Sequence, residues 1–86
     1  MTTYIEENFN KSLEKLSTSS KELSSNDQYH LWGLYKQSTV GNNNEDFPKN
    51  SSLRKKVMWE AWKDEENKSK LQTMKEFSEY ISKLNI

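Results

Sequence analysis

Cysteine is absent from this chain of 86 residues, glycine occurs twice, and proline and histidine occur once each. Without cysteine the chain has no disulfide framework, no thiolate zinc site and no thiol nucleophile. Two glycines outside any Gly-rich pattern exclude a phosphate-binding loop. A single histidine among dispersed carboxylates provides no set of metal ligands. The composition therefore favours a binding protein over an enzyme, and it predicts no metal and no cofactor.

Long hydrophobic runs are also absent. Apolar residues make up 31% of the chain, and none of their runs approaches the roughly 20 residues that cross a bilayer. Thirteen basic and thirteen acidic residues give a formal net charge of +0, so no long-range field draws the chain to nucleic acid. No secretory signal is visible after Met1. We expect a single soluble, cytoplasmic domain over residues 1–86, without stable membrane insertion.

Apolar residues recur at helical spacing, and no segment alternates as a strand would. The first and last helices carry stripes of matching width at Phe9, Leu13 and Leu16 and at Met74, Phe77, Ile81 and Leu84. Pairing these two helices would bury both stripes. Two further helices lie between them, joined by a loop over residues 42–52 that we expect to cross from one end to the other. The prediction is all-α, an irregular four-helix bundle.

Capping patterns predict where these helices begin. Capping boxes are expected at residues 3–6, 25–28 and 69–72, where a serine or threonine precedes Glu or Gln by three positions. The third helix is expected to begin near Ser51 or Ser52 and to turn Leu53, Val57 and Ala61 inward. Its first turn holds Arg54-Lys55-Lys56, where cations oppose the helix dipole. Both a solvated charged face and a functional cluster fit this stretch.

The two glycines and the single histidine also have predicted places. Gly33 costs about 1 kcal/mol relative to alanine inside a helix, so we expect a ligand or a neighbouring helix to approach closely there. Gly41 suits the left-handed residue that ends a helix. His30 is expected at a buried or boundary position.

One stretch, residues 31–41, has the chemistry of a nucleotide site. A helix would place Trp32, Tyr35 and Lys36 on a single stripe. An aromatic ring can stack on a purine, and a nearby cation can hold a phosphate or polarise a carbonyl oxygen. Aromatic residues at this spacing are also typical of a protein core, so the spacing leaves both interpretations open.

Two motifs in the chain resemble those of the acyl-CoA-binding proteins. The segment Trp32-Gly-Leu-Tyr-Lys-Gln-Ser-Thr-Val-Gly41 is close to the family's Tyr-Gly-Leu-Tyr-Lys-Gln-Ala-Thr-Val-Gly. The segment Trp59-Glu-Ala-Trp62 matches the family's Trp-(Asp/Glu)-Ala-Trp. Pro48 falls where the family has a loop proline, and the similarity runs from about Phe9 to Ile86 without a gap.

The resemblance implies an up-down-down-up bundle that binds one medium- to long-chain fatty acyl-CoA as a monomer. It implies an intracellular carrier and pool former without enzymatic activity. In the family, the residue matching Trp32 stacks on adenine, the one matching Tyr35 lines the ligand bowl, and the one matching Lys36 bonds toward the acyl carbonyl and phosphates. Gly33 and Leu34, inside the same motif, belong to the predicted site.

Two further positions of the predicted site depart from the family pattern. Met58 stands where the family usually has a lysine that pairs with the 3′-phosphate. We expect Arg54, one turn earlier on the same face, to supply this charge with help from Lys55. Phe77 replaces a tyrosine and keeps the ring without the hydroxyl. A different ligand preference from the family norm is therefore expected.

One alternative function remains open, and a second is disfavoured. A small helical protein-interaction module would use the aromatic stripe to dock a partner helix. Nucleic-acid binding through Arg54-Lys55-Lys56 is disfavoured, because the basic stretch is short and the chain is neutral.

Overall fold

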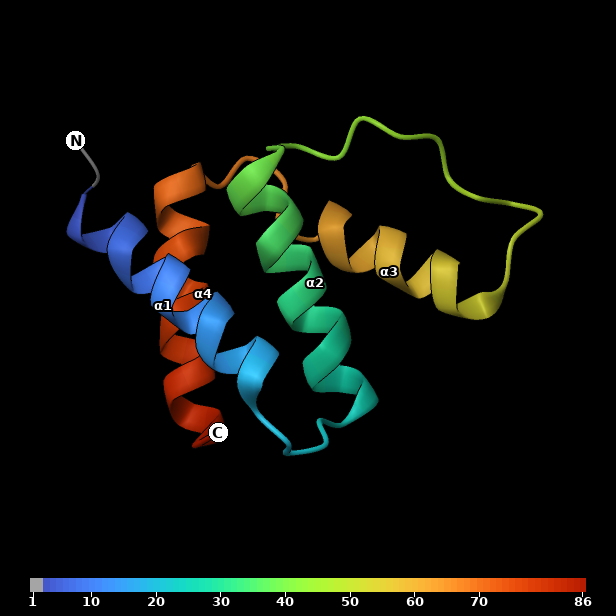
Figure 1. Cartoon of the computed structure of the whole chain (residues 1–86). Coiled ribbons are helices and arrows are strands. Elements are labelled where there is room, and N and C mark those ends of the chain that lie inside the picture. Colours follow the sequence, from blue (N-terminus) through green and yellow to red (C-terminus); the bar gives the residue numbers. More distant parts are fainter. Residues whose placement is uncertain (1–2) are drawn as a thin grey trace.

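The computed structural model describes residues 3–86, which form four helices and no strand. The helices are α1 (Tyr4–Thr18), α2 (Ser25–Thr39), α3 (Leu53–Lys63) and α4 (Lys70–Leu84). Figure 1 shows α1 and α4 side by side and running in the same direction, α2 running the opposite way, and α3 reaching outward from α2. The predicted all-α four-helix bundle is confirmed.

Hydroxyl side chains cap every helix in the described part of the chain, and the capping residues are Thr3, Ser24, Ser52 and Ser69. The box predicted at Thr3 is confirmed, because Glu6 donates its amide to the Thr3 hydroxyl and accepts from the Thr3 amide. The prediction for α2 was wrong by one residue, since Ser24 and not Ser25 is the cap. At α4 only half of the predicted box forms, because the Gln72 side-chain amide donates to Glu76 instead.

The core lies where α4 meets both α1 and α2. Phe77 and Ile81 of α4 are 1% exposed, and they pack in one cluster with Phe9 from α1 and Leu31 and Leu34 from α2. The Phe9 and Phe77 rings meet edge to face, with centroids 5.1 Å apart. The pairing of the first and last helices, predicted from their matching stripes, is confirmed.

The backbones of α2 and α3 come into contact at Gly33. A Cβ placed on Gly33 would lie 2.3 Å from the carbonyl oxygen of Ala61, far inside van der Waals distance. The close approach predicted at Gly33 is confirmed, and the neighbour is a helix. Gly41 has a φ of 100° just after α2, as predicted for the residue that ends this helix.

The loop over residues 42–52 crosses from the end of α2 to the far end of α3, as predicted (Figure 1). Two indole N–H groups of α3 hold the start of this loop. Trp62 donates to the Gly41 carbonyl at 2.7 Å, and Trp59 donates to the Glu45 carbonyl at 2.8 Å. The loop therefore forms a fixed wall beside α3.

Two predicted side-chain positions were wrong. Leu53 was expected to face inward, but it is 76% exposed, because it is the first residue of α3 and lies beyond the reach of α2. His30 was expected to be buried or at a boundary, but it is exposed, and its ring rests on Tyr80 with centroids 4.7 Å apart. None of the helices in residues 3–86 has both the length and the apolar character that a membrane span requires.

One side-chain hydrogen bond links α2 to α4 across 53 positions of sequence. The Tyr80 hydroxyl donates to an Asp27 carboxylate oxygen. This hydrogen bond lowers the pKa of Asp27 below its usual value of 3.8, and it raises the pKa of Tyr80 above 10.0. The bond therefore favours ionised Asp27 and protonated Tyr80.

We expect Gly33→Ala to lower the free energy of unfolding by about 1–3 kcal/mol, because the added Cβ forces α2 and α3 apart. Urea denaturation measures the loss. Alanine exceeds glycine in helix propensity by about 1 kcal/mol, so a more stable variant would show that the helices do not touch there. Asn26→Ala, on an exposed position of the same helix, serves as the control.

We expect Tyr80→Phe to destabilise the fold at pH 7 and to matter less at both extremes of pH. Stability from a lowered carboxylate pKa is present above about pH 4 and is lost as the pH falls through the folded-state pKa. Stability from a raised tyrosine pKa is lost as the pH rises above about 10. Denaturation of both proteins across this range tests the pattern, with Tyr4→Phe as an exposed control. An equal difference at about pH 2 and pH 7 would contradict it.

Candidate functional site

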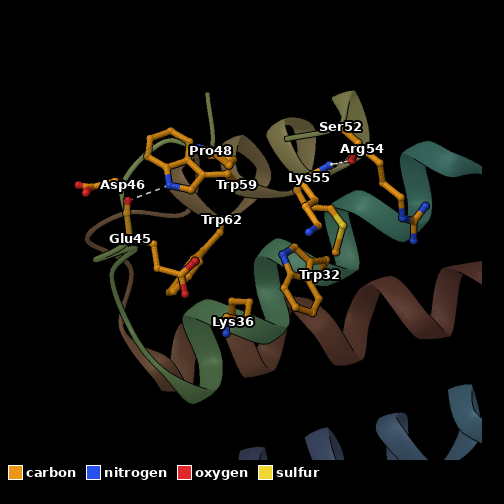
Figure 2. Close-up of a pocket in the computed structure, with 11 residues that line it drawn as sticks. Trp32, Lys36, Glu45, Asp46, Pro48, Ser52, Arg54, Lys55, Trp59 and Trp62 are labelled. Atoms are coloured by element: carbon orange, nitrogen blue, oxygen red, sulfur yellow. Dashed lines mark hydrogen bonds between the residues drawn. The ribbon is translucent and has the colours of Figure 1, made fainter. Parts of the chain in front are cut away.

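A cavity of about 410 Å³ lies between α2, α3 and the loop, and we call it the α2–α3 cavity (Figure 2). Trp32 of α2 and Trp59 and Trp62 of α3 line it, together with Lys36. The Lys36 ammonium lies 5.4 Å from the centroid of the Trp32 ring and 4.7 Å from that of Trp62. Aromatic faces attract a cation at these distances. A fixed positive charge thus stands between two indoles inside the cavity.

The basic residues at the start of α3 point in different directions. Arg54 and Lys55 both line the α2–α3 cavity. However, the Arg54 guanidinium carbon lies 5.7 Å from the centroid of the Tyr29 ring, and Figure 2 shows the guanidinium directed away from Trp32. In the same view Lys55 extends toward Trp32. Lys55 therefore contributes more positive charge to the interior of the cavity than Arg54.

Two carboxylates of the loop also line the α2–α3 cavity. They are Glu45 and Asp46, and Figure 2 shows the Glu45 side chain turned toward Trp62 while Asp46 points outward. Because like charges repel, an anionic group entering the cavity is directed away from the loop and toward Lys36 and Lys55.

A second hollow of about 390 Å³ lies between α1 and α2, and we call it the α1–α2 groove. No pair of Cα atoms from these two helices lies within 8 Å, so side chains alone form its walls. The lining is mainly Leu13, Leu16, Leu23, Leu31, Tyr35 and Phe77, and none of the described side chains that line it is charged. Gln28 also lines the groove, and its side-chain amide donates to the Leu23 carbonyl. The groove fits an uncharged, flexible chain.

Trp32 lines both the α2–α3 cavity and the α1–α2 groove. The centroid of its ring lies 6.4 Å from that of Tyr35, whose own ring stacks on Phe9 of the core. The three residues of the predicted stripe lie near one another, but they do not all face the same hollow, and Trp32 stands between the two hollows. Tyr35 faces the apolar groove, and Lys36 faces the cavity. Together the two hollows offer an apolar space and a cationic, aromatic space that adjoin.

Six of the eight predicted site residues line one of these two hollows. They are Trp32, Lys36, Arg54 and Met58 in the cavity and Trp32, Tyr35 and Phe77 in the groove. Gly33 and Leu34 line neither. Gly33 is occupied by the contact with α3, and Leu34 is fully buried in the core. Both therefore have packing roles in the fold, and contact of either residue with a ligand stays a prediction.

Several residues that line the hollows were not assigned to the site from sequence. Glu45, Asp46 and Ser52 carried no signal, because nothing in the sequence fixes where a loop folds back. Leu13 and Leu16 were assigned to a core stripe, and apolar spacing does not distinguish a core from an open groove. Within residues 3–86, no group of three or more His, Asp or Glu side chains gathers in a way that could hold a metal ion.

Comparisons with known proteins agree with this architecture. The acyl CoA binding protein family model matches residues 6–81. An acyl-CoA-binding protein of Gossypium hirsutum is 40% identical over 80 residues, covering 93% of this chain and 86% of that protein. Acyl-CoA-binding domain-containing protein 3 of Oryza sativa subsp. japonica is also 40% identical over 80 residues, but this chain spans only 50% of its length.

The fold is similar as well. The crystal structure of Oryza sativa Acyl-CoA-Binding Protein 2 matches with a TM-score of 0.86 and 34% identity, over 94% of this chain and 90% of that one. The family model extends from the first turns of α1 to Ile81 in α4. The chain therefore belongs to the acyl-CoA-binding protein family.

Proposed function

We propose that this chain binds one medium- to long-chain fatty acyl-CoA ester, with the acyl tail in the α1–α2 groove and the nucleotide in the α2–α3 cavity. The observation that carries the proposal is the junction of the two hollows at Trp32. A ligand that fills both must have an uncharged tail and an anionic, aromatic head. Acyl-CoA has both parts, and the names of the relatives point to the same ligand.

At the head, Trp32 provides the indole that stacks on adenine, and Lys36 reaches the carbonyl and phosphate region. We assign the main additional phosphate contact to Lys55, because its side chain extends toward Trp32 while the Arg54 guanidinium lies on Tyr29. This revises the expectation that Arg54 leads and Lys55 helps. Met58 lines the cavity but brings no charge.

At the tail, Tyr35 and Phe77 provide aromatic walls beside the leucines of α1. Each buried methylene is worth about 0.8 kcal/mol, so a chain of about 15 carbons gains on the order of 10 kcal/mol before ordering costs. An exposed lysine–phosphate contact contributes about 1 kcal/mol or less. The tail therefore sets most of the affinity, and the head selects the thioester over free fatty acid.

We further propose that the protein acts as a monomeric cytoplasmic carrier and pool former that holds acyl-CoA without transforming it. Family membership supports a binding role. Lipid transport follows from the groove, since a buried tail lets the ester move through water. The proposal involves no cofactor, no nucleic acid and no stable membrane insertion.

Titration with palmitoyl-CoA tests the proposal directly. Because three indoles line the α2–α3 cavity, we expect their fluorescence to change and to saturate at one ligand per chain. Calorimetry gives the stoichiometry independently. No response at micromolar ligand would refute acyl-CoA binding and favour the protein-interaction module instead.

Head-group variants test the assignment of charges. We expect Lys36→Ala and Lys55→Ala each to weaken palmitoyl-CoA binding about fivefold, which corresponds to about 1 kcal/mol per phosphate contact. Arg54→Ala should have a smaller effect, since its guanidinium already lies on Tyr29. Lys63→Ala, outside the cavity lining, is the control. A larger loss for Arg54→Ala than for Lys55→Ala would return the leading role to Arg54.

A further inference from the structure

One end of the molecule concentrates positive charge. Residues 47–58 contain four basic residues and no acidic one, and the basic residues are Lys49, Arg54, Lys55 and Lys56. In the described part of the chain, none of these four forms an ion pair. Figure 1 shows this segment at one tip of the molecule, where the loop leads into α3. This tip points away from α1 and α4. Arg54 rests on Tyr29 and Lys55 extends toward Trp32, which leaves Lys49 and Lys56 free to meet a partner.

The remainder of the chain is acidic. Since the whole chain holds thirteen residues of each sign, the part outside residues 47–58 has four more acidic than basic residues. Positive charge is thus concentrated in residues 47–58 along the sequence, with the carboxylates of Glu45 and Asp46 directly before them. A negatively charged surface attracts this cluster.

Leu53 stands within the basic tip and is 76% exposed. It lines none of the described hollows. The cations beside it oppose the dipole of α3, whose first turn has no acidic residue. An unprotected leucine and unpaired cations at the start of a helix both cost stability or solubility, so a role outside the fold accounts for them.

We propose that this tip, formed by Leu53 with Lys49 and Lys56, docks on the surface of a bilayer rich in anionic lipids. Lipid phosphates and carboxylates pair with the cations, and Leu53 inserts among the head groups. A bilayer fits better than an acidic protein, because one isolated leucine can enter lipid but cannot form the clustered apolar centre of a protein interface. This proposal does not depend on whether the chain binds acyl-CoA.

Vesicle binding without ligand tests the proposal. We expect the protein to co-sediment with phosphatidylcholine vesicles that contain about 30% phosphatidylserine at low salt, and to be released at about 0.5 M salt. Pure phosphatidylcholine vesicles should bind at least tenfold less. Removing two cations with Lys49→Ala and Lys56→Ala, neither of which lines the α2–α3 cavity, should weaken partitioning about 25-fold. Leu53→Ser should weaken it about tenfold.

Matched controls lie on α4. Lys75→Ala with Lys83→Ala removes the same charge, and Leu71→Ser removes a leucine that is 43% exposed; both should leave partitioning unchanged. Because the chain has no cysteine, a dye attached through Leu53→Cys should report an apolar environment on the vesicles. Equal losses in the control variants, or binding to an acidic peptide without binding to anionic vesicles, would overturn the proposal.

Discussion

The contact between Gly33 and the Ala61 carbonyl sets how closely α3 lies against α2, and the cationic half of the candidate site depends on it. A Cβ at position 33 would lie only 2.3 Å from the Ala61 carbonyl oxygen. Because the two helices do come together, Trp62 reaches the Gly41 carbonyl and stands beside Lys36. Both halves of this contact lie within the motifs that mark the family. The motifs are therefore explained by packing as much as by the ligand.

The apolar half of the site depends on a separation instead of a contact. α4 lies close to both α1 and α2, but no Cα atom of α1 lies within 8 Å of one in α2. Leu13 and Leu16 are consequently left lining a groove and not a closed core. Keeping this apolar surface open costs hydrophobic stabilisation in the unliganded protein. A ligand with an apolar tail would recover this stabilisation, and the gain would favour its binding.

Sequence patterns predicted the fold well, because each helix carries its own signal of spacing and capping. Thr3, Gly33 and Gly41 each have a local requirement that fixes their place. Leu53 and His30 were placed wrongly, because helical spacing does not say whether a neighbouring helix extends far enough to cover a given turn. Leu53 lies at the tip of α3, where no helix covers it.

For the candidate site, spacing brought Trp32, Tyr35 and Lys36 together correctly but did not show that they face two hollows. The orientation of Arg54 depends on Tyr29, and the loop wall depends on hydrogen bonds to Trp59. These are long-range contacts without a local signature. The pairing of Tyr80 with Asp27 has the same character, since 53 positions separate them.

Helix α3 is held by its neighbours more than by its own sequence. It has eleven residues, of which Trp62 is the buried one, and isolated helices of this length are marginal in water. Its first turn adds cations that oppose the dipole, at a cost of about 0.3–1 kcal/mol each. The Gly33 contact and the two indole hydrogen bonds offset this cost. The stability of α3 therefore comes from the side that meets α2 and the loop. Its first turn can carry positive charges that serve a ligand or a surface, because the fold does not depend on this turn.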